Sequence, residues 1–363
     1  MTYKIISLFS GAGFLDFGFA ENGFEIVWGA ELISEFALAN NYNMRLRYGH
    51  SNRVHNIDIT MVNPRDIPIA DGVIGGPPCQ DFSKGNAKSQ GVEGNRGSLV
   101  WDFLAKIEYL RPKFFLFENV DALYTTKKHR TEALMPLLEQ FSNLGYKPYF
   151  RVLNALDYGI PQDRSRVFIV AFREEIINLL QENDLPIFQW PKPLFNNAKD
   201  TFKWPDMWDY GTVVDEEDFI NQLQYPYCLT VHSRIGREEE LINLPNHISF
   251  RAYSNKFFTT PEGKFKGKSF KRLHRFRYSP TLAYGNNEVH LHPTKPRRLT
   301  VREALRIQSV PDWYEFPVGL SLTDMFKMVG NGVAFELAEL LAIQIKEVLD
   351  NYYSIINEPF AIL

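Results

Sequence analysis

Residues 4–16 read Lys4-Ile5-Ile6-Ser7-Leu8-Phe9-Ser10-Gly11-Ala12-Gly13-Phe14-Leu15-Asp16, and this stretch decides the fold. Its apolar first half predicts a buried strand, the two glycines predict a turn, and a helix is expected to open after them. Glycine lets a ligand approach the backbone, and a helix amino terminus offers unpaired N–H groups to an anionic group. The spacing departs from Gly-x-Gly-x-x-Gly and so disfavours a pyrophosphate-containing cofactor. A turn that merely connects two elements is the alternative.

Short apolar runs alternate with amphipathic stretches up to about residue 172, which is typical of a doubly wound, mostly parallel α/β sheet. The pattern predicts strands at residues 4–9, 25–30, 72–74, 114–117, 148–153 and 167–172, and helices at 34–42, 99–110 and 131–144. Helical periodicity returns at residues 301–307 and 333–349. We expect a catalytic domain over residues 1–188, completed by a C-terminal helix in 323–363. A smaller, irregular strand-and-loop domain with a hinge is expected over residues 189–322.

The bulk composition predicts a soluble intracellular enzyme: 45% of the 363 residues are hydrophobic and 23% are charged. The two cysteines are far apart in the sequence and support neither a zinc site nor a disulfide framework. The formal net charge is −3, yet basic and aromatic residues alternate between Arg251 and Arg277. Such a segment in an acidic protein indicates a phosphate-binding surface, with a merely solvated face as the alternative.

One cysteine stands in an unusual setting, Gly75-Gly76-Pro77-Pro78-Cys79-Gln80-Asp81-Phe82-Ser83, directly after an apolar run. The carboxyl ends of strands are where open α/β sheets bind their ligands. An isolated cysteine is often a buried apolar residue, but rigid proline and glycine flanks followed by polar residues favour a nucleophile.

Carboxylates follow other predicted strands at the same edge of the sheet. Glu31 ends the second strand and can accept hydrogen bonds from ribose hydroxyls, and Asp58 is placed to receive an adenine amino group. Glu118 follows residues 114–117, where partial burial would raise its pKa and make it a plausible proton donor. Each could instead be a surface or helix-capping carboxylate. Farther along, Gln162, Arg164 and Arg166 are predicted to project to one side, where the guanidinium groups suit an anionic or carbonyl-bearing substrate. Surface ion pairing is the alternative.

Taken in order, these motifs resemble those of the DNA (cytosine-5)-methyltransferase family over nearly the whole chain. The matching segments are Ser7-Leu8-Phe9-Ser10-Gly11-Ala12-Gly13, Gly75-Gly76-Pro77-Pro78-Cys79-Gln80, Phe117-Glu118-Asn119-Val120, Gln162-Asp163-Arg164-Ser165-Arg166, Arg298-Leu299-Thr300 with Glu303 and Gln308, and Val329-Gly330-Asn331-Gly332-Val333. Phe14 stands where the family often has glycine, which affects the expected shape of the methionine pocket.

The resemblance implies a class I methyltransferase fold and transfer of a methyl group from S-adenosylmethionine to C5 of a flipped-out cytosine in a short duplex DNA sequence, without a metal. The catalytic residues implied are Cys79, which would add to C6, with Glu118, Arg164 and Arg166. The cofactor-binding residues implied are Phe9, Gly11, Gly13, Glu31, Asp58, Ile59, Pro78, Leu99, Asn331 and Val333. DNA contacts are expected from Gln80, Ser83, Arg96, Lys268, Lys271, Arg272, Arg275, Arg277 and Thr281, most of them in a target-recognition domain.

The family also implies a monomer in the bacterial cytoplasm, associated with the nucleoid and not with a membrane. It leaves open the recognised sequence, the modified cytosine, and whether a cognate restriction endonuclease acts separately beside it. Two rival hypotheses remain: an RNA methyltransferase of the same fold, and a DNA-binding regulator with a degenerate enzyme core. The second predicts loss of at least one of the four catalytic residues, and all four are present.

Overall fold

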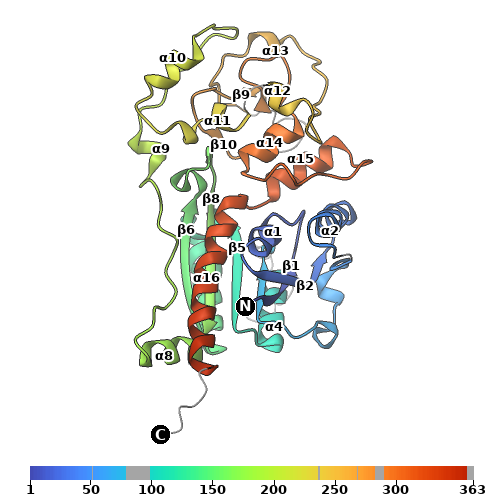
Figure 1. Cartoon of the computed structure of the whole chain (residues 1–363), viewed down its shortest axis with the longest axis vertical. Coiled ribbons are helices and arrows are strands. Elements are labelled where there is room, and N and C mark those ends of the chain that lie inside the picture. The colour runs from blue at the N-terminus through green and yellow to red at the C-terminus, as the bar shows by residue number, and fades with distance from the viewer. Residues whose placement is uncertain (51, 79–98, 236–237, 268, 283–289, 358–363) are drawn as a thin grey trace.

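The computed structural model describes residues 1–50, 52–78, 99–235, 238–267, 269–282 and 290–357. Figure 1 shows two lobes along the longest axis of the molecule. One lobe contains the main sheet and its helices, and the other contains the segment from α10 to α15.

A seven-stranded sheet forms the first lobe, in the order β3-β2-β1-β4-β5-β8-β6. Its strands are β1 (Tyr3–Leu8), β2 (Phe24–Glu31), β3 (Val54–Asn56), β4 (Gly72–Gly75), β5 (Phe114–Val120), β6 (Tyr146–Asn154) and β8 (Ser165–Arg173). Neighbours from β3 to β5 run parallel, and β8 runs antiparallel to both β5 and β6. The chain order reverses between β1 and β4, and ligands of open α/β sheets bind outside the strand ends at such a switch point. The predicted doubly wound sheet is confirmed.

Helices cover both faces of the sheet because its buried strands present apolar residues alternately to either side. In β5, Phe114 and Leu116 belong to one core, whereas Phe115 and Phe117 belong to the other. The first core is closed by α1 (Phe14–Ala20), α2 (Ser34–Tyr48), α8 (Glu174–Glu182) and α16 (Phe335–Ile356). The second core is closed by α4 (Leu99–Leu110), α5 (Ala122–Thr125) and α7 (Met135–Asn143), with α6 (Lys127–His129) and a π-helical turn, Arg130–Leu134, before α7.

Most described residues of the second lobe lie in loops and turns; the sequence pattern predicted its helix at residues 301–307 but none of its one-turn helices. The helices of this lobe are short. They are α9 (Ala198–Thr201), α10 (Glu216–Asn221), α11 (His232–Ile235), α12 (Glu238–Leu241), α13 (Lys256–Thr259), α14 (Val301–Ile307) and α15 (Leu322–Asn331). Two pairs of two-residue strands accompany them: β7 (Gln162–Asp163) with β10 (Ser279–Pro280), and β9 (Lys271–Arg272) with β11 (His290–Leu291). Helices of one turn contain too few residues to show a period in the sequence.

The predicted domain limits remain predictions, and the chain at both limits keeps contact with the neighbouring lobe. Past residue 188 the chain still follows the sheet: the ring of Phe188 packs against Tyr149 and Phe172, and the Tyr158 hydroxyl donates to the carbonyl of Pro191. Helix α15 packs against α14 in the second lobe (Figure 1).

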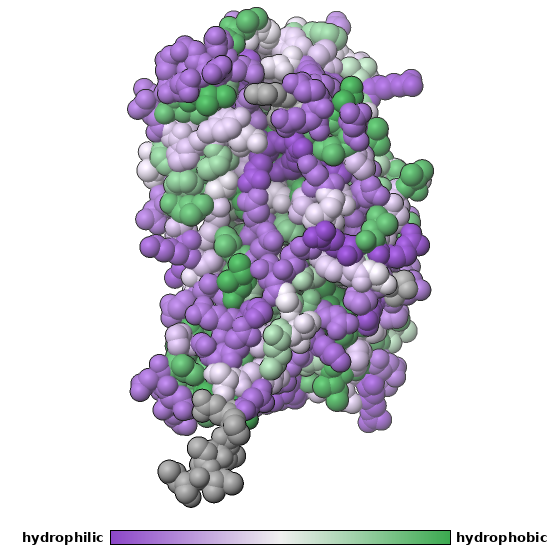
Figure 2. Space-filling model, in the orientation of Figure 1, coloured by the Kyte–Doolittle hydropathy of each residue, from purple (hydrophilic) through white to green (hydrophobic). Residues whose placement is uncertain are grey.

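The C-terminal part of the predicted catalytic domain is two helices, α15 and α16, with a 40° bend between them. Gly332 leaves α15 in an extended conformation, and a Cβ atom there would lie 2.2 Å from Cδ2 of Phe14. Among the described residues no single helix is long and apolar enough to span a membrane, and only the bent pair of α15 and α16 meets that length and composition. One face of α16 is buried. On the face shown in Figure 2, hydrophobic residues form separate groups among hydrophilic ones.

Candidate active site

The glycine turn connects β1 to α1 and lies against the carboxyl end of β2. Phe9, Gly11 and Gly13 all have positive φ (56°, 58° and 88°), a conformation that glycine adopts without strain. The N–H of Gly11 donates to Oε2 of Glu31 at 2.8 Å, and the N–H of Ile33 donates to Oε1 at 2.9 Å. Burial raises the pKa of Glu31, and these backbone hydrogen bonds oppose that rise. Glu31 therefore holds the turn against the end of β2.

Asp58 follows β3, the strand next to β2, and the N–H of the preceding Ile57 donates to the main-chain carbonyl of Glu31 at 3.0 Å. Oδ1 of Asp58 accepts from the N–H and the hydroxyl of Thr60, at 2.9 and 2.8 Å, and so begins a 3-10 turn, Ile59–Met61. No described residue donates to its Oδ2. Ile59 is buried in the core, while Leu99 is half-buried at the start of α4.

The loop between α15 and α16 packs against the start of α1, far from it in the sequence. Gly332 packs directly against the ring of Phe14, because a Cβ atom on this glycine would lie 2.2 Å from Cδ2 of the ring. The hydroxyl of Tyr314 donates to the carbonyl of Ala12 at 2.9 Å. Asn331 is exposed and Val333 is buried on either side of Gly332. The structure thus gathers most of the predicted cofactor residues around one end of the sheet.

The approach to the predicted nucleophile is fixed by two residues of β5. Cys79 itself lies outside the described residues, as do Gln80, Ser83, Arg96 and Lys268; Pro78 is described and exposed. Nδ2 of Asn119 donates to the carbonyl of Pro77 at 2.9 Å, and a Cβ atom on Gly76 would lie 2.7 Å from Oε2 of Glu118. Asn119 belongs to the motif Phe117-Glu118-Asn119-Val120, but the sequence did not indicate that its side chain would bind the carbonyl of Pro77.

Glu118 and Arg166 form an ion pair at this end of the sheet, with 3.1 Å between Oε1 of Glu118 and Nε of Arg166. Glu118 is 9% exposed. Burial raises its pKa, and the charges of Arg166 and Arg164 only partly offset that rise. A carboxyl group in this setting can hold a proton, or share one, at a higher pH than a solvated glutamate.

Arg164 does not join this ion pair by any described hydrogen bond. Its side chain is 1% exposed, and Nη2 donates to the carbonyls of Gly330 and Gly332 at 3.0 and 2.6 Å. Gln162, Arg164 and Arg166, predicted to project to one side, therefore reach three different partners, since Gln162 contacts Gln308. Gln308 belongs to the motif that begins at Arg298, but that motif did not indicate that Gln308 would contact Gln162 and Gly332.

The predicted DNA-contacting residues of the second lobe differ in exposure. Lys271, Arg277 and Thr281 are half-buried, and the Thr281 hydroxyl donates to the carbonyl of Asp163 at 2.7 Å. Arg272 is 0% exposed and donates to the carbonyls of five residues: Phe257, Thr260, His292, Pro293 and Lys295.

Arg275 is 6% exposed and binds both carboxylate oxygens of Glu262, at 3.1 and 3.2 Å. Counting charges along the sequence cannot separate such buried guanidinium groups from surface ones. The expectation that Arg272 and Arg275 contact DNA directly does not fit their burial.

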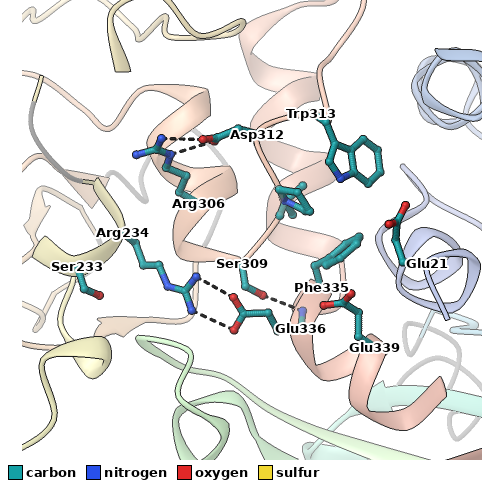
Figure 3. Close-up of a pocket in the computed structure, with 12 residues that line it drawn as sticks. Glu21, Ser233, Arg234, Arg306, Ser309, Asp312, Trp313, Phe335, Glu336 and Glu339 are labelled. Atoms are coloured by element: carbon teal, nitrogen blue, oxygen red, sulfur yellow. Dashed lines mark hydrogen bonds and ion pairs between the residues drawn. The ribbon is translucent and has the colours of Figure 1, made fainter. Parts of the chain in front are cut away.

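A cavity of about 380 Å³ lies where the two lobes meet and contains none of the predicted site residues (Figure 3). Two bidentate ion pairs border it: Arg234 with Glu336 at 2.7 and 3.0 Å, and Arg306 with Asp312 at 2.9 and 2.7 Å. The first pair connects α11 to α16. Within the described residues, no group of three or more His, Cys, Asp or Glu side chains could hold a metal ion.

The fold defines the class of protein: it is that of the class I methyltransferases. A solved prophage-encoded DNA modification methyltransferase from E. coli matches 96% of this chain and 100% of its own with a TM-score of 0.64 at 24% identity. A DNMT2 from Spodoptera frugiperda matches 95% of this chain and 100% of its own with a TM-score of 0.57 at 18% identity. Identities this low show the fold alone.

Sequence similarity narrows the class to one family. The chain belongs to the C-5 cytosine-specific DNA methylase family, whose model matches residues 3–347, and is a DNA (cytosine-5) methyltransferase. The Type II methyltransferase M.NmeDI of Neisseria meningitidis is 39% identical over 96% of this chain and 84% of its own. M.FnuDI of Fusobacterium nucleatum, also a Type II methyltransferase, is 31% identical over 98% of this chain and 97% of its own.

Proposed function

We propose that the chain methylates C5 of a flipped-out cytosine in a specific short duplex DNA sequence, through a covalent bond between Cys79 and C6. S-adenosylmethionine, when bound, supplies an electrophilic methyl group. The arrangement around the glycine turn fits this donor. Gly11 would leave the turn open, since a Cβ there has no atom within 4 Å, and Glu31 presents its carboxylate beside it. Asp58 follows the neighbouring strand β3, and no described residue donates to its Oδ2. The other residues proposed to hold the donor are Phe9, Gly13, Ile59, Pro78, Leu99, Asn331 and Val333.

The chemistry requires a nucleophile, because C5 of cytosine is unreactive while the ring is aromatic. An unperturbed thiol with a pKa of about 8.5 is only a few per cent thiolate at neutral pH, yet cysteine is intrinsically very nucleophilic. The Cys79 thiolate adds its electron pair to C6, and the ring electrons move toward C5 and N3. C5 would then bond to the methyl group as the S–CH3 bond of the sulfonium donor breaks, which would leave a neutral thioether. The C5 proton passes to water, and the S–C6 bond breaks to restore both the ring and the thiolate.

Glu118 and Arg166 handle the charge that develops during this addition. Glu118 is proposed to protonate or hydrogen-bond N3, for which its raised pKa is suited. Arg166 is proposed to hold Glu118 in place and to donate to O2 of the base. The single observation that carries the proposal is the buried Glu118–Arg166 pair in contact with Gly76, three residues before Cys79.

DNA contacts are proposed for Gln80, Ser83, Arg96, Lys268, Lys271, Arg277 and Thr281, and a structural role for Arg272 and Arg275. We propose that the protein acts as a monomer without a metal, beside a separate cognate restriction endonuclease. The relatives are named Type II methyltransferases, which supports that pairing.

The test uses labelled S-adenosylmethionine with duplex DNA and, in parallel, with transfer RNA. Label in 5-methylcytosine of DNA is expected, and labelling of RNA alone would instead support the RNA methyltransferase hypothesis. Cys79→Ser is expected to abolish transfer while binding of duplex DNA remains; full turnover by this variant would refute the nucleophile. Bisulfite sequencing of DNA from cells that express the chain would then identify the recognised sequence.

A further inference from the structure

A buried chain of hydrogen bonds joins three parts of the fold that are far apart in the sequence. Nε2 of Gln162 lies 2.7 Å from Oε1 of Gln308, and Nε2 of Gln308 donates to the carbonyl of Gly332 at 2.6 Å. Arg164 donates to the same carbonyl, also at 2.6 Å. Gln162 and Gln308 are completely buried and Arg164 nearly so, so water does not compete for these hydrogen bonds.

The direction of every hydrogen bond in this chain is determined by its two ends. The Gly332 carbonyl can only accept, so Gln308 must offer its Nε2 there and present Oε1 to Gln162. At the other end the N–H of Leu282, in the second lobe, points to Oε1 of Gln162 at 3.5 Å. Gln162 therefore holds the Gln308 amide group in its donating orientation.

Gly332 is the residue that this chain of hydrogen bonds immobilises. Two donors on one carbonyl use both of its lone pairs and fix the orientation of that peptide group. The same glycine contacts the ring of Phe14 at the start of α1 and stands between Asn331 and Val333.

We propose that Gln308 and Arg164 are positioning residues, which hold the Gly332 carbonyl so that Asn331 and Val333 stay in place for S-adenosylmethionine. Gln162 supports Gln308 and links the loop to the second lobe through Leu282. This inference rests on the proposed function, because the cofactor defines what the loop is for. It also changes the role of Arg164, which was predicted to be catalytic, to one that acts through the loop.

The test replaces Gln308 by Glu, which has the same shape but, when ionised, turns an acceptor toward the Gly332 carbonyl. The dissociation constant of S-adenosylmethionine is measured by calorimetry, together with KM for each substrate and kcat at saturating cofactor. We expect Q308E to weaken cofactor binding about tenfold, the effect of one lost buried hydrogen bond, and kcat to stay within about twofold. Q308M, which lacks the donor without adding repulsion, should show a smaller increase in the same direction and serves if Q308E does not fold.

The matched control is Arg234→Gln. It breaks the ion pair with Glu336, another contact between the second lobe and α16, without touching Gly332 (Figure 3). Its cofactor affinity should match wild type. If wild type binds cofactor and neither Gln308 variant differs from it, or if Arg234→Gln is equally impaired, the positioning role is wrong and the proposed function stands. If wild type binds no S-adenosylmethionine, both fail together. Equal changes in KM for DNA, KM for cofactor and kcat would indicate a general packing defect and also overturn the inference.

Discussion

Gly76 and Glu118 adjoin so closely that a Cβ atom on the glycine would lie 2.7 Å from Oε2 of the carboxylate. The backbone leading to Cys79 and the group proposed to meet N3 of the base are therefore set against each other, without space for a methyl group. Asn119 ties the same backbone through the carbonyl of Pro77. Two consecutive residues of β5 thus hold the backbone at Gly76 and Pro77, shortly before the predicted nucleophile in the sequence.

Gly76→Ala should consequently reduce methyl transfer by about a hundredfold, because displacements of about 1 Å at a reacting centre have effects of that size. The overpacking should also lower the free energy of unfolding by about 1–3 kcal/mol. Steady-state rates and thermal unfolding measure the two effects. The double variant G76A/E118A has room for the added methyl group and should unfold at nearly the temperature of E118A. If G76A alone unfolds like wild type, the contact is not as described.

Glu118→Gln should lower kcat by about a hundredfold or more, the usual contribution of general acid catalysis. Because burial raises the pKa of Glu118, the protonated form persists to higher pH and is lost as the pH rises through that value. The wild-type rate should therefore fall on the alkaline side where Glu118 ionises, and this fall should be absent from the variant. Asp121→Asn, at a half-buried carboxyl before α5, is the control and should keep the wild-type profile. An identical alkaline fall in E118Q would assign it to another group.

Asp16 predicts a second pH dependence, this time of stability. It is completely buried in α1, accepts from the hydroxyl of Ser7 at 2.6 Å and from Nδ2 of Asn40 at 2.8 Å, and burial raises its pKa to about 6. A raised pKa means that the folded protein binds this proton more tightly than the unfolded chain does. The resulting stabilisation is complete below the unfolded value of 3.8 and is lost as the pH rises through about 6.

The difference in unfolding free energy between wild type and Asp16→Asn should therefore change by about 2–3 kcal/mol between pH 4 and pH 7, in favour of wild type at the lower pH. Denaturant unfolding at several pH values measures it, and other titrating groups cancel in the difference. Asp209→Asn, at an exposed carboxyl, should give no such change. Parallel stability curves for wild type and D16N would contradict the prediction.

Arg272→Met should destabilise the second lobe, since it leaves buried carbonyls without their donor. The guanidinium also lies 4.3 Å from the ring centre of Tyr210, and burial lowers its pKa to about 10, so it stays charged near neutrality. We expect a loss of at least about 3 kcal/mol, as for other broken buried charge networks. Lys271→Met, at the half-buried neighbour, should keep wild-type stability and lose DNA affinity instead. Thermal melts measure the stability of both variants and gel shifts measure their DNA affinity. If Arg272→Met lost DNA affinity while keeping wild-type stability, Arg272 would be a DNA-contacting residue after all.

The sheet lobe was predictable because its signals are local. The strand, turn and helix of residues 4–16 follow one another, and the carboxyl ends of parallel strands must meet at one edge, which brings Glu31 and Glu118 to the same end of the sheet. Helix α4 begins and ends at the predicted residues. In each case the neighbours that decide the structure are adjacent in the sequence or related by a general rule of sheets.

The roles of Arg164 and Arg272 were not predictable, because their hydrogen-bond partners are distant in the sequence. Arg164 binds carbonyls more than 160 residues away, and Arg272 binds the carbonyls of His292 and Lys295. Every residue has a backbone carbonyl, so the pattern of side chains in the sequence does not indicate which carbonyls will accept these hydrogen bonds. A basic residue that the sequence predicts to be on the surface can therefore be buried in the structure and bind backbone carbonyls there.

Strand β8 runs against its neighbours, and this reversal governs how the chain reaches the second lobe. The first residues of β8 lie at the edge of the sheet where β1, β4 and β5 end, so Arg166, the second residue of β8, reaches the site from the start of its strand. The strand then leads away from that edge to α8, and the chain has to travel back along the sheet past Phe188 before α9. The second lobe is consequently tethered by a return path packed on the sheet, which restricts how far it can swing from the catalytic residues when DNA enters.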